Sequence, residues 1–260
     1  MKPHKVSVVL LSLLCFLPLV IYGEEGLNRK EFTLGGTVSY LKREKSGGSN
    51  QTGTLGGIRA GFDRFKRYSW YIGAETEALW GTLRGHNRFQ DKLHSDFISF
   101  WGEGRFGYTF QSKCFPYLAF TPFIGGGFLE ENNNFSSPSP IPIHFRTHAP
   151  YAAGGFFSWI DLGSGFEGGL NLKLKLPIDP KCHVHNDPMN PPSQQLINER
   201  LLWRIELPLS YRLNPCASRL VTISPFWELR SYGKRINYPF DFLNTRLNFW
   251  GVSVLYVIRI

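Results

Sequence analysis

Long apolar runs and cysteines are both scarce in this sequence. Beyond residue 23 no stretch approaches the roughly 20 consecutive apolar residues that a membrane-spanning helix needs, which argues against a helical membrane protein. Only four cysteines occur, and Cys15 lies in the apolar N-terminal run, so three are left, an odd number too small for a disulfide scaffold. Helical periodicity is also missing between the strand-like segments, which excludes βαβ folds and the nucleotide-binding sites that they carry.

Residues 1–23 have the features of a secretory signal peptide. Two lysines precede an apolar run, and Gly23 offers a plausible cleavage end. Because the run is short for a membrane span, cleavage is favoured over an uncleaved anchor. We therefore predict a signal peptide over 1–23, a short N-terminal segment over 24–31 and one folded domain over 32–260.

Acidic residues are fewer than basic ones. Lysine and arginine number 29 against 20 aspartates and glutamates, a net charge of +9, and removing Lys2 and Lys5 with the signal peptide leaves +9 − 2 = +7. A basic surface suits an anionic partner. With an export signal, anionic lipid or sugar phosphate is a better candidate than nucleic acid, which we do not expect as a partner.

Aromatic residues and glycines are abundant, at 15% and 27 residues, and the stretch from Trp70 to Trp80 shows how they are used. Its even positions are uncharged, whereas its odd positions include Glu75 and Glu77, and this period of two is typical of a strand. Ten residues span about 33 Å, or about 25 Å at a tilt of about 40°, which is the height of the apolar band of an outer-membrane barrel.

The same alternation recurs in nine further segments. It is clearest over 165–176 and poorest over 117–128, which contains Pro122, and over 144–159, which is rich in Gly and Ala. The ten predicted strands are about 32–41, 54–65, 70–80, 96–110, 117–128, 144–159, 165–176, 200–213, 220–230 and 250–260.

The connections between these segments alternate between long and short. The long ones are predicted over 42–50, 81–95, 130–143, 177–198 and 232–244, and the short ones over 66–69, 111–116, 161–165 and 214–219. We therefore predict an all-β protein, an antiparallel barrel of about ten strands, with eight or twelve as alternatives. A soluble β-sandwich is the main rival fold.

The pattern resembles the small transmembrane β-barrels of Gram-negative outer membranes, of OmpA-like or omptin size, over essentially all of 32–260. The last segment alternates from Trp250 to Ile260, as does the terminal strand that such proteins offer to the barrel-assembly machinery, although family members usually end in an aromatic residue. The resemblance implies export to the cell outer membrane, short periplasmic turns, long extracellular loops and a periplasmic segment at 24–31.

Charged residues of both signs fall on the faces predicted to point inward. Because even eight strands enclose a lumen that side chains fill, we expect a packed ion-pair network. A narrow solute or ion path is an alternative, and the neighbouring Glu75 and Glu77 also invite an acid/base interpretation. Asp63, Arg146 and His148 are assigned to the same faces. The predicted network comprises Arg59, Glu75, Glu77, Glu103, Arg105, Glu167, Lys173, Lys175, Arg204, Glu206, Arg212, Glu228 and Arg230.

Two further sets would contact the membrane. Interfacial aromatic girdles are predicted from Trp70, Trp80, Tyr108, Trp159, Trp203, Tyr211, Trp227, Trp250 and Tyr256. Basic loop residues can bind lipopolysaccharide phosphates, with solvated loop charge as the alternative. These candidates are Arg84, Arg88, Lys92, Lys234 and Arg235, with Lys42, Arg43 and Lys45 in the first loop.

No metal site or cofactor is expected. Residues 182–187 read Cys-His-Val-His-Asn-Asp, but a structural zinc site needs four fixed ligands, so a coincidental polar cluster in a loop is favoured. Cys114 and Cys216 fall in short turns on the same predicted side and could form a disulfide bond if the turns are close enough.

Taken with the resemblance, the sequence favours a membrane-anchored scaffold with a charged, largely plugged lumen. Its loops would contact lipopolysaccharide, a host surface or another protein. A narrow porin is the second possibility, and a rim hydrolase, similar to omptin proteases or lipid A deacylases, is the third. The residues Asp91, His94, Asp96, His183, His185 and Asp187 could lie near the rim, and His94 precedes Ser95. None matches either family's motif, so no catalytic residue is carried over and we expect no enzyme.

Overall fold

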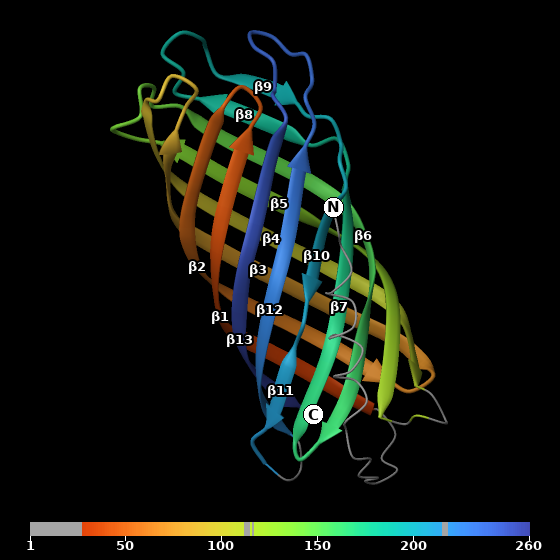
Figure 1. Cartoon of the computed structure of the whole chain (residues 1–260). Helices are drawn as coiled ribbons and strands as arrows, with labels where there is room; N and C mark the ends of the chain where they lie inside the picture. The colour runs from red at the N-terminus through yellow and green to blue at the C-terminus, as the bar shows by residue number, and fades with distance from the viewer. Residues whose placement is uncertain (1–27, 112–114, 116, 215–217) are drawn as a thin grey trace, which may run out of the picture.

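The computed structural model describes residues 28–111, 115, 117–214 and 218–260, which form an antiparallel barrel (Figure 1). Its strands are β1 (Asn28–Lys45), β2 (Ser49–Lys66), β3 (Ser69–His86), β4 (Lys92–Gln111), β5 (Leu118–Phe135), β6 (His144–Gly163), β7 (Phe166–Pro177), β8 (Lys181–His185), β9 (Ser193–Leu196), β10 (Leu202–Glu206), β11 (Leu209–Arg212), β12 (Arg219–Tyr232) and β13 (Thr245–Arg259).

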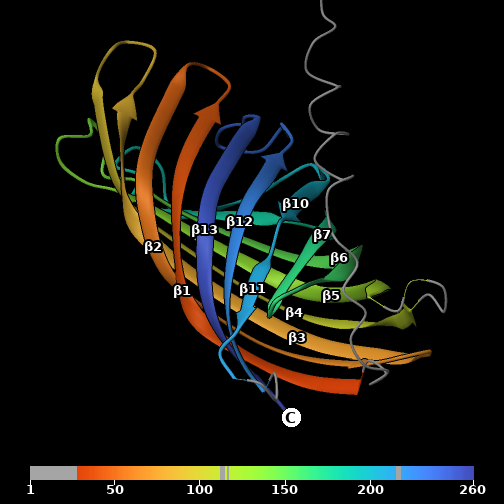
Figure 2. The same cartoon turned by 60° about the horizontal axis from the view of Figure 1, so that its bottom comes forward.

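Each wall strand pairs with a neighbour on both sides, so the sheet closes on itself. β1 pairs with β2 and with β13, and β7 joins β6 to β10 and β11, which in turn pair with β12. Figure 2 shows β3 to β6 behind β12 and β13, on the opposite side of the barrel. We call the end where β1 begins and β13 finishes the terminal end, and the opposite end the loop end.

The prediction of an antiparallel barrel with ten strand positions is confirmed. β10 and β11 occupy one position, predicted as a single strand over 200–213, and the interruption falls at Leu207 and Pro208. Proline has no N–H to donate to the ladder. The neighbouring backbone adapts: Leu207 N donates to Pro225 O at 3.0 Å, and Gly169 N donates to Pro208 O at 3.0 Å.

The two weakly patterned segments are also barrel strands, β5 and β6. The glycines of β5 allow close contact with the neighbouring strand and do not interrupt β5. A Cβ added to Gly127 would lie 2.2 Å from the carbonyl oxygen of Gly102 on β4, so a larger residue does not fit without a backbone shift.

The predicted long loops are shorter than expected, because the strands continue past the apolar outer band. β1 and β2 are joined by residues 46–48 alone, where Gly47 and Gly48 have φ values of 98° and 89°. β3 and β4 are joined by residues 87–91. Polar residues facing outward give these segments the composition of loops, although inward-facing residues such as Leu83 and Leu93 are apolar and the backbones stay in the sheet.

The longest predicted loop, over 177–198, contains β8 and β9. β8 pairs with the first residues of β6, from His144 to His148, beyond the point at which β7 ends. Isolated bridge pairing between Asn198 and Gly233 then connects the segment after β9 to the segment after β12. The wall therefore continues around the loop end.

Residues before Asn28 lie outside the described part of the chain, as do the predicted signal peptide and residues 24–27. β1 begins at Asn28, four residues before the predicted start of the domain. Within the described ranges, no helix has the length and apolar character needed to cross a membrane.

Candidate functional site

The middle of the barrel lumen holds a balanced set of buried charges, which we call the lumen network. It contains six cations and six carboxylates, and none of these residues is more than 7% exposed. Eleven of them were predicted to face inward. The members are Arg59, Glu75, Glu77, Glu103, Arg105, Glu131, Lys173, Lys175, Arg204, Glu206, Glu228 and Arg230.

Arg204 is the centre of the network and is completely buried. Its Nη1 lies 2.7 Å from Glu77 Oε2 and 3.0 Å from Glu228 Oε2, and its Nε lies 2.5 Å from Glu206 Oε1. The guanidinium also lies 4.0 Å from the ring centroid of Phe226. One arginine of β10 therefore joins carboxylates from β3, β10 and β12 across the lumen.

The network continues in both directions from Arg204. Arg230 links Glu228, at 2.7 Å, to Glu131, at 2.8 Å, toward the loop end. Arg59 links Glu206, at 2.9 Å, to Glu75, which also pairs with Lys173 and Arg105. Because every carboxylate has a cationic partner, the charges fill the lumen without leaving an isolated buried ion.

A second cluster closes the terminal end, and two predicted network residues, Glu167 and Arg212, lie there instead. Glu167 accepts hydrogen bonds from Arg259, Arg212 and the indole of Trp159, the last at 2.7 Å. The Arg29 guanidinium lies 4.7 Å from the ring centroid of Trp159. A cavity of about 140 Å³, lined by Arg59 and Glu206 on one side and by Arg29 and Glu167 on the other, separates this cluster from the network.

Above the network, toward the loop end, the lumen is filled by an apolar cluster that the sequence did not reveal. We call it the loop-end core. It combines inward-facing residues of the wall strands with residues of β8 and of the β12–β13 connection. Its buried members are Leu41, Leu55, Leu79, Leu83, Phe97, Cys182, Val184, Ile197, Phe226, Tyr232, Phe242, Leu247 and Phe249.

Two basic residues predicted for the first loop, Arg43 and Lys45, point into this region instead. Arg43 Nη1 donates to Gln51 Oε1 at 3.0 Å, and Lys45 Nζ lies 4.8 Å from the ring centroid of Phe145. Burial, together with a smaller effect of the nearby charge of Arg43, lowers the pKa of Lys45 to about 8. Neither side chain is therefore available to bind a phosphate outside the barrel.

Aromatic residues form two rows on the outer face. Trp70, Tyr108, Tyr211 and Tyr256 lie toward the terminal end, and Trp80, Trp203, Trp227 and Trp250 lie toward the loop end, with Leu, Ile, Val and Phe exposed between the rows. The rings of Trp203 and Trp227 are 4.4 Å apart, and Trp227 is the register partner of Trp250.

Trp159 was wrongly assigned to these rows. Phe157 and Trp159 both face inward on β6, whereas Phe156 and Ile160 face outward. Because both faces of β6 carry large apolar residues here, the sequence does not alternate and does not indicate which face Trp159 is on. The reverse error affects Arg146 and His148, which face outward; the Arg146 side chain is 54% exposed and pairs with Glu130 at 2.8 Å.

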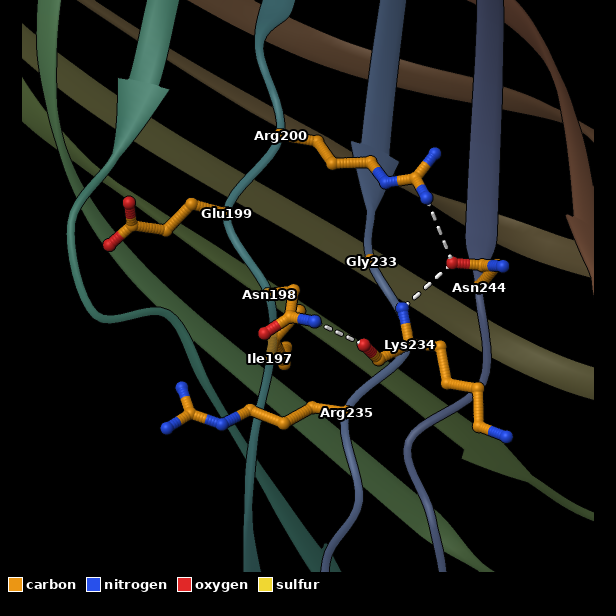
Figure 3. A pocket seen from close by; sticks show the side chains of 8 residues that line it. All are labelled: Ile197, Asn198, Glu199, Arg200, Gly233, Lys234, Arg235 and Asn244. Carbon is orange, nitrogen blue, oxygen red and sulfur yellow. Dashed lines mark hydrogen bonds between the residues drawn. The ribbon is translucent and has the colours of Figure 1, made fainter.

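The five predicted anion-contact residues are exposed at the loop end but do not form one site. Arg84 lies on β3, Lys92 begins β4, and Arg88 lies between them with its guanidinium 4.5 Å from the ring of Phe89. Lys234 and Arg235 are on the other connection, between β12 and β13, where they line an open pocket with Arg200 (Figure 3). Arg200 was not predicted as a contact residue.

The run over 182–187 does not gather its ligand-type side chains. Strand alternation in β8 directs Cys182 and Val184 inward and leaves His183 and His185 partly exposed. Within the described ranges, no three His, Cys, Asp or Glu side chains come together as a metal site. Burial raises the pKa of the Cys182 thiol to about 11. Cys114 and Cys216 lie outside the described residues, so the predicted disulfide stays a prediction.

Two residues of these clusters are not predicted from the sequence: Glu131 belongs to the lumen network, and Arg29 belongs to the cluster at the terminal end. Glu131 had been placed in a loop, although its odd numbering continues the inward face of Gly127 and Leu129. Arg29 had been placed before the first strand. In both cases the strand is longer than its apolar part, and the parity of the neighbouring residues was the available signal.

Comparison with known proteins gives a likeness of fold. No protein-family model matches, and no curated protein matches either. Among solved structures, the outer membrane protease OmpT from Escherichia coli aligns over 92% of this chain and 99% of its own, with a TM-score of 0.55 and 9% identity. The translocator domain of the autotransporter NalP from Neisseria meningitidis aligns over 88% and 89%, with a TM-score of 0.46 and 8% identity. The chain thus has the closed ten-stranded fold of small outer-membrane β-barrels.

Proposed function

We propose that the protein is an outer-membrane barrel that serves as an occluded, membrane-anchored scaffold for surface interactions. The exposed apolar band supports membrane insertion, and the two aromatic rows have the positions of interfacial girdles. The terminal end then faces the periplasm, and the loop end faces outward. The fold likeness to OmpT supports this placement.

The filled lumen is the observation that carries the scaffold interpretation. The lumen network occupies the middle of the barrel, and the loop-end core lies over it with Leu41, Leu55 and Phe249 at 0% exposure. An ion path would need a continuous column of water beside polar groups, and an apolar core across it is a barrier to ions. The observation therefore favours an occluded barrel over a narrow porin.

Partners would meet the loop end. Met189, Ile236 and Tyr238 are 83%, 83% and 91% exposed there, which is unusual for large apolar side chains and favours contact with another molecule. Basic residues such as Arg84 and Arg235 suit lipopolysaccharide phosphates, and a host or bacterial surface protein would use the loops. During biogenesis, the alternating β13 would be presented to the barrel-assembly machinery.

Planar-bilayer recording combined with membrane fractionation tests this proposal. The protein should be found in the outer membrane, migrate heat-modifiably in detergent gels and show no steady single-channel conductance, with a known porin as the positive control. Steady conductance would replace the scaffold with the narrow-channel function. A freely soluble monomer would rule out both.

A second candidate function rests on one contact. His94 Nδ1 lies 2.9 Å from Ser136 Oγ, a nucleophile-and-base arrangement at the loop end. No acidic side chain orients the imidazole in the described residues, and Ser139 also binds the backbone of His94, which gives the contact a structural use. Turnover of peptide or lipid A by refolded protein, abolished by Ser136→Ala, would establish a rim hydrolase.

A further inference from the structure

An open pocket of about 640 Å³ lies at the loop end, where the segment leading into β10 meets the two ends of the β12–β13 connection (Figure 3). This volume is in the usual range for small-ligand sites, about 300–1,000 Å³. Its lining is almost entirely polar and comprises Ile197, Asn198, Glu199, Arg200, Gly233, Lys234, Arg235 and Asn244.

The segments around the pocket are fixed to one another. Asn244 Oδ1 accepts hydrogen bonds from Arg200 Nη2 at 3.2 Å and from the backbone N of Lys234 at 2.7 Å. Asn198 and Gly233 exchange backbone hydrogen bonds, and a Cβ added to Gly233 would lie 2.8 Å from that of Asn198. Close packing therefore holds the basic side chains on a defined frame rather than on a free loop.

The pocket has an excess of positive charge. Three of its side chains are cationic, and Glu199 is the one acid in its lining. Glu199 Oε1 accepts a hydrogen bond from the backbone of Asp179 at 3.1 Å. In Figure 3, Arg200 and Lys234 extend to one side of the pocket, and Arg235 extends to the other with Glu199. Lys234 Nζ lies 3.6 Å from Asp241 Oδ2, outside the pocket lining. The side of Arg200 and Lys234 therefore has two cations with one acid, and the side of Arg235 has one cation with one acid, so the first side is the more basic.

This basic side lies next to the loop-end aromatic row. Arg200 precedes Trp203 by three residues, roughly 10 Å along an extended chain. Arg246, exposed on β13, lies between Asn244 and Trp250 and makes no ion pair in the described part of the protein. Exposed aromatic rings next to an apolar band mark the depth at which lipid headgroups begin. Phosphate groups at that depth would meet Arg200 and Lys234 first.

We propose that this pocket binds a phosphate group of a glycolipid of the outer leaflet, with Arg200 and Lys234 as its charged contacts and the neighbouring tryptophans against the acyl chains. Arginine binds phosphate oxygens through two parallel N–H donors, and lysine adds a compact charge. The inference rests on the proposed membrane location and specifies one lipid-binding position on the barrel.

Native mass spectrometry of the full-length protein in detergent tests the assignment. The ligands are bisphosphorylated lipid A, dephosphorylated lipid A and inorganic phosphate. We expect the double variant Arg200→Gln, Lys234→Gln to lose at least tenfold in lipid A binding. The charge-preserving pair Arg200→Lys, Lys234→Arg should retain most of it. The matched control, Arg146→Gln with Lys181→Gln, removes the same charge from the β6–β8 side, where both cations pair with acids, and should change binding less than twofold.

Several results would overturn the proposal. Equal losses in the pocket and control variants would mean diffuse charge attraction, and no loss in either would exclude the pocket. Equal binding of dephosphorylated lipid A would exclude phosphate recognition, and tight binding of inorganic phosphate alone would assign a soluble anion. Heat-modifiable migration verifies that each variant is folded. Failure of the scaffold function would appear separately, as conductance or solubility of the unaltered protein.

Discussion

Replacing Arg204 with methionine removes the cation that three buried carboxylates share. Glu228 keeps Arg230 at 2.7 Å, and Glu206 keeps Arg59 at 2.9 Å. Glu77 has no second cation among the ion pairs of the described chain, and its other partners are Trp101 Nε1, at 2.9 Å, and the Thr37 hydroxyl, at 3.3 Å. The substitution therefore leaves Glu77 as an uncompensated charge with 1% exposure.

The size of the effect follows from that isolated charge. Breaking a buried pair by removing one partner costs about 3–5 kcal/mol, because the remaining ion has lost both water and its counter-charge. Methionine retains similar apolar volume beside Phe226, so little of the loss should come from a cavity. We expect Arg204→Met to lower the free energy of unfolding by about 3–5 kcal/mol.

Changing Glu77→Gln as well should recover much of this loss. The double variant has no isolated charge, so the two substitutions should be non-additive by about 0.5–3 kcal/mol, as is typical of residues in one network. Tryptophan fluorescence during urea titration of barrels refolded into phosphatidylcholine vesicles measures each unfolding free energy. Heat-modifiable migration provides an independent measure of the folded fraction.

Arg246→Met is the matched control, because Arg246 is exposed on the outer face of β13. Its effect should be within about 0.5 kcal/mol. If Arg204→Met costs no more than Arg246→Met, or if the losses from Arg204→Met and Glu77→Gln simply add, the network does not balance buried charge as inferred.

Three further predictions concern the outer face and the loop-end core. Ala74 is exposed in the middle of the apolar band of β3, so Ala74→Arg should cost about 2–4 kcal/mol of folding free energy in bilayers. The control Thr52→Arg, beyond the band on β2, should cost less than about 1 kcal/mol. Equal costs would refute the assignment of Ala74 to the outer face. The folded pKa of Lys45, about 8, is below that of the unfolded chain, so the unfolded state binds more protons between about pH 8 and 10.5 and stability rises with pH there. Unfolding titrations across this range should show that rise for the unaltered protein relative to Lys45→Met, and parallel curves would contradict it. The Cys182 thiol is 1% exposed and its pKa is raised to about 11. In a folded chain whose Cys114 and Cys216 are replaced by serine, it should resist alkylation at neutral pH and react once the chain is unfolded. Rapid labelling of the folded barrel would show that the loop-end core is open.

The fold was predictable because a barrel with an apolar outer face repeats one local rule. Between its aromatic ends most strands alternate apolar and polar residues, and this pattern depends only on strand geometry and on the contrast between the outer face and the lumen. The Trp70 to Trp80 segment shows this alternation with an aromatic residue at each end. Nine repetitions of it were sufficient to predict closure, the strand number and the inward direction of residues such as Glu75 and Arg204.

The rule fails where a strand leaves the apolar band, because water outside the barrel then favours polar residues on the outer face. Lys42 and Glu44 face outward on β1, while Leu41 faces the loop-end core. The sequence over 42–50 consequently had the composition of a loop, although most of it is strand. The same loss of contrast concealed Glu131 as a member of the lumen network. It also led to the wrong prediction that Lys45 is a loop residue outside the barrel.

The sequence alone thus determined which residues alternate, and through that the class of fold and most of the buried charges. Their partners were decided by tertiary structure. Arg204 and Glu77 are 127 residues apart and meet only because closure places β10 and β3 on opposite sides of one lumen. The pocket beside Arg200 likewise joins residues 197–200 to the two ends of the β12–β13 connection. Periodicity records the face of a strand, whereas contacts across a lumen depend on how the whole sheet closes.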